Sequence, residues 1–110
     1  MNKQQLLEDL KELAIPRHSK WDPLGLMSVR IYVKDRLSCY GDVVEHSFKE
    51  GSEEGVNYIL KFPGHNPNSD PLLIGAHYDG PIKSPGADDN ASGLAALFAL
   101  AEYWTNNPPK

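Results

Sequence analysis

The chain has 110 residues, of which 40% are apolar and 24% are charged, and its formal net charge is −4. This composition is ordinary for one small globular domain. An acidic balance without a basic cluster counts against nucleic acid, and against an anionic membrane, as the main partner. A lone cysteine, Cys39, excludes an internal disulfide, and the N-terminus is too charged for a signal peptide. With no apolar run of membrane-spanning length, these features favour a cytoplasmic protein.

Two helices are expected in the first forty residues. Apolar side chains recur at helical spacing over about residues 3–14, and Pro16 ends that pattern. A second helix is expected over about residues 23–40, because Asp22 can cap its start and Gly41 suits its C-terminal cap. Both helices have apolar residues on one face, so each is expected to cover a core.

A β-hairpin is expected next. Residues 42–49 are expected to form one strand with Val44, His46 and Phe48 on one face. Apolar residues alternate over residues 56–62, and a short polar segment joins the two runs. A link of this length favours an antiparallel pair of strands. Glu53 and Glu54 fall at the tip of this hairpin, where solvated side chains are expected rather than a catalytic pair.

A third strand, a polar loop and a third helix follow. The apolar run over residues 72–76 does not alternate, which suits a strand over residues 72–77 that is covered on both faces, as in a parallel sheet. His77 and Asp79 stand two residues apart at its end, so their side chains are expected to project together. Three polar residues, 88–90, then precede a helix over about residues 91–106, which is apolar on nearly all sides and should be heavily buried.

The histidine and the carboxylates of this loop can form a metal site, since imidazole and carboxylate groups are both normal zinc ligands. Two carboxylates about 4 Å apart repel by roughly 4 kcal/mol at an effective dielectric constant near 20, and a divalent ion would remove that repulsion. The alternative is a solvated acidic loop with a helix cap and a structural histidine. Residue spacing alone leaves both interpretations open.

Two motifs, AHYD and SPGADDNASG, resemble the co-catalytic zinc exopeptidases, the aminopeptidase family that also includes glutaminyl cyclases. The upstream segments GDVVEHSF and GVNYILKFPG occur in that family's order. The resemblance therefore extends over essentially the whole chain, but only over the first part of the family's domain. It implies an α/β fold of three αβα layers, in which the hairpin leads into a parallel strand and helices cover the sheet. Residues 1–110 would form a single domain that is incomplete at its C-terminus.

The resemblance also implies roles for individual residues. His77 corresponds to a ligand of one zinc ion, and Asp89 to the carboxylate that bridges two zinc ions. Asp79 corresponds to the catalytic residue that orients His77, and a carboxylate in that position fixes the imidazole tautomer. The peptide bond between Asp89 and Asn90 is expected to be cis, as it often is in this family. The implied activity is hydrolysis of N-terminal peptide bonds in peptides or proteins by a metal-activated water.

The family's general base, a glutamate, and its remaining zinc ligands correspond to positions beyond Lys110. We therefore expect the isolated 110 residues to be inactive. Two other functions are alternatives to the aminopeptidase activity. One is a glutaminyl cyclase-like enzyme with one zinc ion. The other is a non-catalytic interaction module, and an open sheet edge would allow the chain to associate with itself.

Overall fold

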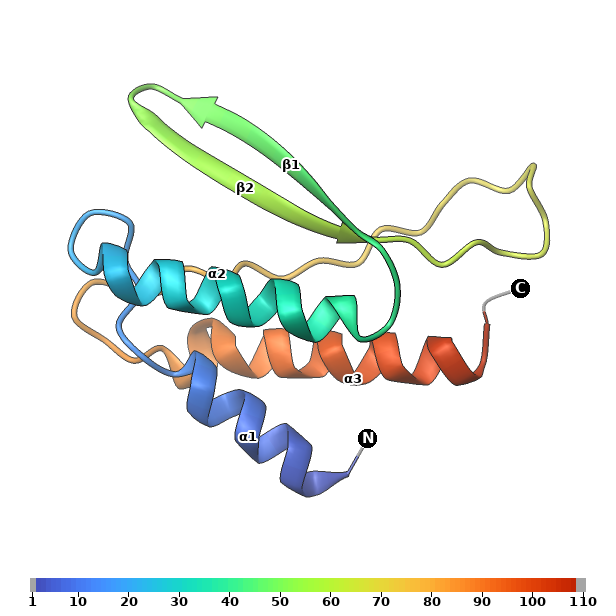
Figure 1. The fold of residues 1–110 in the computed structure, drawn as a ribbon, viewed down its shortest axis with the longest axis horizontal. Coiled ribbons are helices and arrows are strands. Elements are labelled where there is room, and N and C mark those ends of the chain that lie inside the picture. Colours follow the sequence, from blue (N-terminus) through green and yellow to red (C-terminus); the bar gives the residue numbers. More distant parts are fainter. Residues whose placement is uncertain (1, 109–110) are drawn as a thin grey trace.

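The computed structural model describes residues 2–108, which form three α-helices and one β-hairpin (Figure 1). In chain order the elements are α1 (Lys3–Leu13), α2 (Pro23–Ser38), β1 (Val43–Glu50), β2 (Glu53–Leu60), a short π-helical turn η1 (Ala87–Ala91) and α3 (Ser92–Asn106). Helices α2 and α3 lie side by side, α1 contacts both of them, and the hairpin extends from the other side of α2. The mixed α/β class expected from the sequence is confirmed at this level.

The ends of the first two helices follow local chemistry. Asn2 caps α1 by accepting a 2.8 Å hydrogen bond from the backbone three residues later. Pro23 occupies the first position of α2, but Asp22, expected as its cap, makes no capping hydrogen bond within the described residues. Helix α2 ends two residues before the expected end at Tyr40, because the Tyr40 N–H donates to the carbonyl of Leu37 and so tightens the last turn.

The antiparallel hairpin is confirmed. Val43 lies opposite Leu60 at its base, and pairing continues to Glu50 and Glu53 at its tip, so β2 begins three residues before the expected start. The hairpin extends away from the helices, and most of its side chains are exposed to solvent (Figure 1). Glu53 and Glu54 are exposed, as expected of a solvated tip.

The strand expected over residues 72–77 is not confirmed, because the described structure has no strand over these residues. The sheet of residues 2–108 has two strands, β1 and β2, and residues 72–77 run beside α3 without a strand on either side. A β-strand needs a neighbour to accept and donate its backbone hydrogen bonds, and residues 72–77 pair with neither β1 nor β2. The side chains of Leu72 and Leu73 are consequently 81% and 89% exposed.

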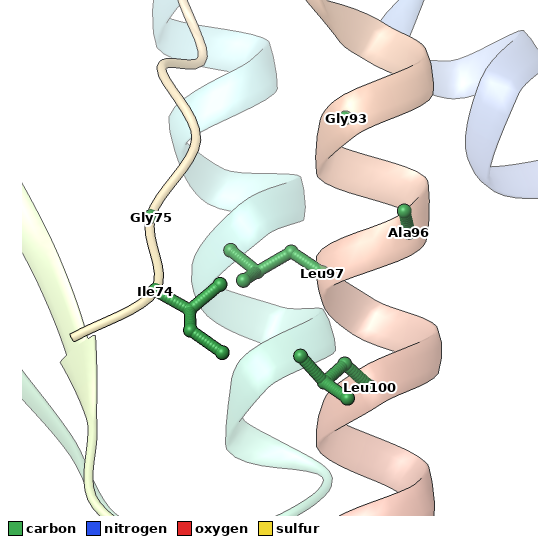
Figure 2. A pocket seen from close by; sticks show the side chains of 6 residues that line it. All are labelled: Ile74, Gly75, Gly93, Ala96, Leu97 and Leu100. Carbon is green, nitrogen blue, oxygen red and sulfur yellow. The ribbon is translucent and has the colours of Figure 1, made fainter. Parts of the chain in front are cut away.

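Helix α3 is buried on one side only. Its buried residues are Leu94, Ala95, Phe98 and Ala101. On the side toward the extended segment, Leu97 and Leu100 are half-buried and line a shallow apolar pocket with Ile74 and Gly75 (Figure 2). The expected burial of α3 on nearly all sides is therefore wrong, because no pleated strand covers this second face.

The main core lies where the three helices meet. Its buried side chains are Leu13 from α1, Val29, Val33 and Leu37 from α2, and Ala91, Leu94 and Phe98 from η1 and α3. Residues from η1 and the first turns of α3 thus belong to the best-packed part of the molecule. This packing fixes the position of η1, where Asp89 is located.

A buried ion pair ties α1 to α2. The carboxylate of Asp9 is 0% exposed and accepts a 2.8 Å hydrogen bond from Nε of Arg36, together with hydrogen bonds from the Tyr32 hydroxyl and the Gln5 amide. The Arg36 guanidinium also lies over the ring of Phe98, 5.3 Å from its centre. The network therefore links both N-terminal helices to the α3 core.

The environment of the Tyr32 hydroxyl leads us to predict that the protein loses stability in alkaline solution. Burial raises the pKa of its hydroxyl above the ordinary value of 10.0, and the hydrogen bond to Asp9 and the charge of Asp9 raise the pKa further. Because the folded state keeps a proton that the unfolded state releases, the free energy of unfolding falls as pH rises above about 10. Below that pH the contribution is fully present.

Urea unfolding at pH 8, 9, 10 and 11 would measure this effect. We expect the midpoint to fall most steeply above pH 10, and we expect Tyr32→Phe to show a smaller fall over the same interval. An identical alkaline fall in both proteins would show that Tyr32 is not responsible.

Candidate metal centre

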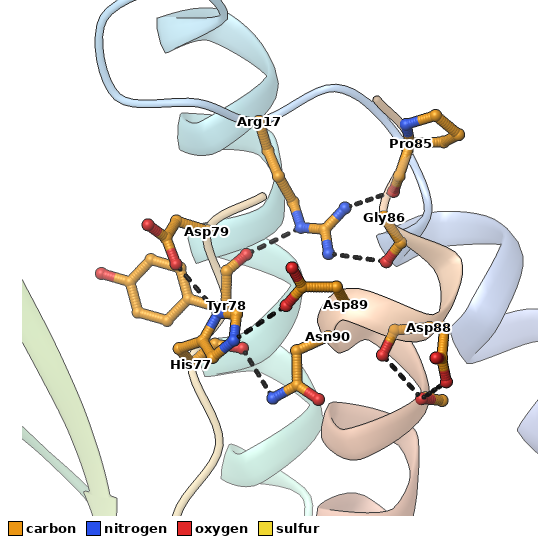
Figure 3. Close-up of polar contacts among 10 residues, drawn as sticks. Arg17, His77, Tyr78, Asp79, Pro85, Gly86, Asp88, Asp89 and Asn90 are labelled. Carbon is orange, nitrogen blue, oxygen red and sulfur yellow. Dashed lines mark hydrogen bonds and ion pairs between the residues drawn. The ribbon is translucent and has the colours of Figure 1, made fainter. Parts of the chain in front are cut away.

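The structure brings together the three side chains that the sequence singled out as site residues (Figure 3). His77 Nδ1 lies 3.0 Å from Oδ1 of Asp79, and His77 Nε2 lies 3.2 Å from Oδ1 of Asp89. His77 and Asp79 come from the end of the extended segment, whereas Asp89 comes from η1. The imidazole is thus held between two carboxylates, one on each ring nitrogen.

This arrangement provides a place for a cation. If Nδ1–H of His77 donates to Asp79, Nε2 carries a lone pair that faces an oxygen of Asp89. Two facing lone pairs 3.2 Å apart repel unless a proton or a metal ion lies between them. Nitrogen and oxygen ligands of one tetrahedral zinc ion are roughly 3.4 Å apart, given bond lengths near 2.0–2.2 Å. The two atoms therefore fit as two of the ligands of one metal ion.

Further ligands are not found nearby. Within residues 2–108 no group of three or more His, Cys, Asp or Glu side chains is arranged to hold a metal ion. Asp88 does not join the pair, since the Ser92 hydroxyl lies 3.4 Å from its carboxylate and donates to its backbone carbonyl. His77 and Asp89 are each more than half exposed, so their open side is accessible to additional ligands.

The backbone of η1 places Asp89. Gly86, at its start, has a φ of +56°, and a Cβ atom at this position would lie 2.4 Å from the Asp89 carbonyl oxygen. Any other residue would therefore displace the Asp89 backbone or strain this turn. The Asp89–Asn90 peptide bond is cis, as the family resemblance implied. The Asn90 side-chain amide lies 3.4 Å from the backbone carbonyl of His77 and closes the site from below (Figure 3).

Arg17 is a central part of this region that sequence reasoning missed. It lies in the linker between α1 and α2, and its side chain is 0% exposed. Its Nε donates to the carbonyl of Tyr78 at 2.8 Å, and its Nη2 donates to the carbonyl of Gly86 at 3.1 Å. No signal in the sequence indicates these contacts, because an arginine after a helix-ending proline is ordinarily a surface residue.

The charge of Arg17 is compensated from a distance. Burial lowers the pKa of the guanidinium, and the negative charges of Asp79 and Asp89 oppose that shift. Its hydrogen-bond acceptors are neutral backbone carbonyls. The carboxylates of Asp79 and Asp89 therefore supply the counter-charge for the buried guanidinium of Arg17.

The comparisons with known proteins agree in pointing to peptidases. The model of peptidase family M28 matches residues 57–110. The vacuolar membrane protease of Schizophyllum commune is 39% identical over 57 residues, and that of Schizosaccharomyces pombe is 38% identical over 56 residues. The leupeptin-inactivating enzyme 1 of Streptomyces exfoliatus is 37% identical over 71 residues. No solved structure matches the chain significantly.

These matches cover 52%, 51% and 64% of the chain, but only 6%, 7% and 16% of the respective relatives. The chain thus spans a small part of the length of the curated relatives it matches.

The names of these relatives also correct the expected location of the protein. The predicted cytoplasmic location is contradicted by fungal relatives named vacuolar membrane proteases. That expectation rested on a single cysteine and a charged N-terminus, and these local features do not indicate the compartment of a much longer protein. Among residues 2–108, no helix combines the length and apolarity needed to cross a bilayer.

Proposed function

The chain is related to peptidase family M28 through residues 57–110, and from this premise we propose that it forms the N-terminal portion of a zinc-dependent aminopeptidase. The proposed substrates are peptides and proteins with a free N-terminus. One observation carries the proposal: Nε2 of His77 and a carboxylate oxygen of Asp89 face each other at 3.2 Å, with Asp79 on the other ring nitrogen.

Each side chain has a proposed role in this activity. His77 would hold one zinc ion, and Asp89, which has two carboxylate oxygens, would hold that ion and a second one. Asp79 accepts a hydrogen bond from Nδ1–H of His77, fixes the tautomer that leaves Nε2 free, and raises the basicity of that nitrogen. Bound zinc supplies a Lewis acid for the scissile carbonyl and an activated water. The exposed side of the pair leaves room for the substrate and for ligands from other segments.

We also propose that residues 72–77 become a parallel strand in a three-layer αβα domain. The exposed side chains of Leu72 and Leu73 support this step, as does the half-open face of α3 beside Ile74. In the described structure the segment already runs along α3 in an extended path (Figure 2). Strands from other parts of the protein would supply the backbone partners that it lacks here.

Metal removal tests the proposed function. We expect the proposed longer protein, of which this chain forms the N-terminal portion, to hydrolyse aminoacyl anilides. We expect a zinc chelator to lower its rate by at least about 10²-fold, because a catalytic metal contributes several kcal/mol and each 1.36 kcal/mol is tenfold in rate. Added zinc should restore the activity. Hydrolysis that resists chelation would contradict the proposal.

The same experiment separates the other functions. Ammonia release from peptides with N-terminal glutamine, without anilide hydrolysis, would indicate the cyclase-like enzyme. A protein that neither binds zinc nor turns over either substrate would indicate an interaction module.

A further inference from the structure

We propose that Arg17 is a positioning residue of the metal centre, which holds His77 and Asp89 at ligand spacing although it contacts neither side chain. This inference rests on the proposed function, since it concerns the same pair of ligands. It assigns a specific task to a buried arginine that lies in sequence far from both zinc-binding motifs.

The hydrogen bonds of Arg17 join the two ends of the loop that separates the ligands. Nε donates to the carbonyl of Tyr78, the residue directly after His77, and Nη2 donates to the carbonyl of Gly86, where η1 begins (Figure 3). Nη1 donates to the carbonyls of Pro85 and Ile15, and the latter fixes the guanidinium to the linker after α1. One rigid group therefore determines how far apart the two ligand-bearing segments lie.

The planar shape of the guanidinium is essential to this task. Its donors point in fixed directions from a rigid fork, whereas a lysine ammonium is a compact point charge that cannot reach carbonyls on opposite sides at once. The surrounding backbone fits the fork closely. A Cβ atom on Gly80 would lie 3.1 Å from Cγ of Arg17, and one on Gly86 would lie 3.2 Å from Nη2. The loop therefore lies directly against the arginine side chain.

The charge of Arg17 has a second effect that must be separated from its shape. A buried cation near Asp79 and Asp89 reduces the repulsion between the two carboxylates, but it also repels an incoming zinc ion. Arg17→Lys keeps the charge and removes the fork. If positioning dominates, this conservative variant loses zinc affinity. If charge alone matters, the variant binds zinc as the unmodified protein does.

The test uses the proposed longer protein, which supplies the remaining ligands, and compares zinc affinity, measured by chelator competition, in its unmodified form and in two matched variants. We expect Arg17→Lys to bind zinc about 10- to 100-fold more weakly, the usual loss when a group that orients a ligand is removed. Arg30→Lys is the control, because Arg30 contacts the Tyr78 hydroxyl at 3.2 Å rather than the loop backbone. It should bind zinc within about twofold of the unmodified protein, since this contact lies outside the loop backbone. The visible spectrum of the cobalt(II)-substituted protein should change in Arg17→Lys alone.

A milder variant covers the case in which Arg17→Lys does not fold. Gly80→Ala keeps Arg17 and adds a methyl group 3.1 Å from its Cγ atom, so zinc affinity should fall in the same direction by a smaller factor. Unchanged zinc affinity in folded Arg17→Lys overturns the inference, and so does unchanged affinity in Gly80→Ala if only that variant folds. Absence of zinc binding by the unmodified protein instead overturns the proposed function, and this inference with it.

Discussion

In the proposed longer protein, replacing Asp89 with alanine is expected to lower peptide hydrolysis by at least about 10²-fold, because losing a ligand should exceed the 10- to 100-fold cost of losing a group that only orients one. Zinc content should fall as well, since His77 Nε2 would face no second donor at 3.2 Å. The chain should still fold, because the Asp89 side chain is 69% exposed and Asp79 continues to provide a counter-charge for Arg17. The measurements are kcat/KM with an aminoacyl anilide and bound zinc by elemental mass spectrometry.

Asp88→Ala provides a closely matched control. Asp88 is the adjacent carboxylate and is also exposed, but its nearest polar partner is Ser92 rather than His77. We expect this variant to keep activity and zinc content near those of the unmodified protein. Equal losses in both variants would favour the solvated acidic loop over a specific metal centre. Full activity in Asp89→Ala would exclude the proposed bridging role.

Local patterns in the sequence predicted the elements on which the site is built. The alternation over residues 56–62 and the short polar link before it predicted the hairpin, and helical spacing predicted α1 and α2 with ends correct to within about two residues. The two-residue spacing of His77 and Asp79 placed their side chains together, as observed. The proximity of Asp89 to His77 was expected only from the family resemblance, because residue spacing alone does not determine whether the loop between Asp79 and Asp89 folds back toward His77.

The remaining features depend on contacts between distant segments. A strand at residues 72–77 requires neighbouring strands, so its apolar pattern was not sufficient to form it. The burial of Arg17 depends on carbonyls more than sixty residues away, at Tyr78 and Gly86. Asp9 is similar, because an acidic residue in an amphipathic helix usually faces solvent, and only the approach of α2 explains its burial. In all three cases the outcome depends on tertiary structure that local propensity does not encode.

Asp9→Ala is expected to lower the free energy of unfolding by about 3–5 kcal/mol, the usual cost of removing one partner of a buried ion pair. The variant would leave the Arg36 guanidinium, whose side chain is 12% exposed, without its carboxylate. It would also remove the acceptor of the Tyr32 hydroxyl. Urea unfolding followed by circular dichroism measures the loss, and Glu8→Ala, an exposed neighbour on α1, should stay within about 0.5 kcal/mol.

A double variant identifies the source of that loss. Asp9→Leu combined with Arg36→Met removes both charges and keeps apolar volume beside Phe98, over which Arg36 lies. Replacing a buried pair by apolar residues of similar size is often neutral or stabilising. We therefore expect the double variant to recover most of the stability lost in Asp9→Ala. If it is no more stable than the single variant, the network contributes through its specific geometry, and the loss does not arise from an uncompensated charge. Because the same network joins α1 and α2 to α3, its failure would also disturb η1 and the linker that carries Arg17.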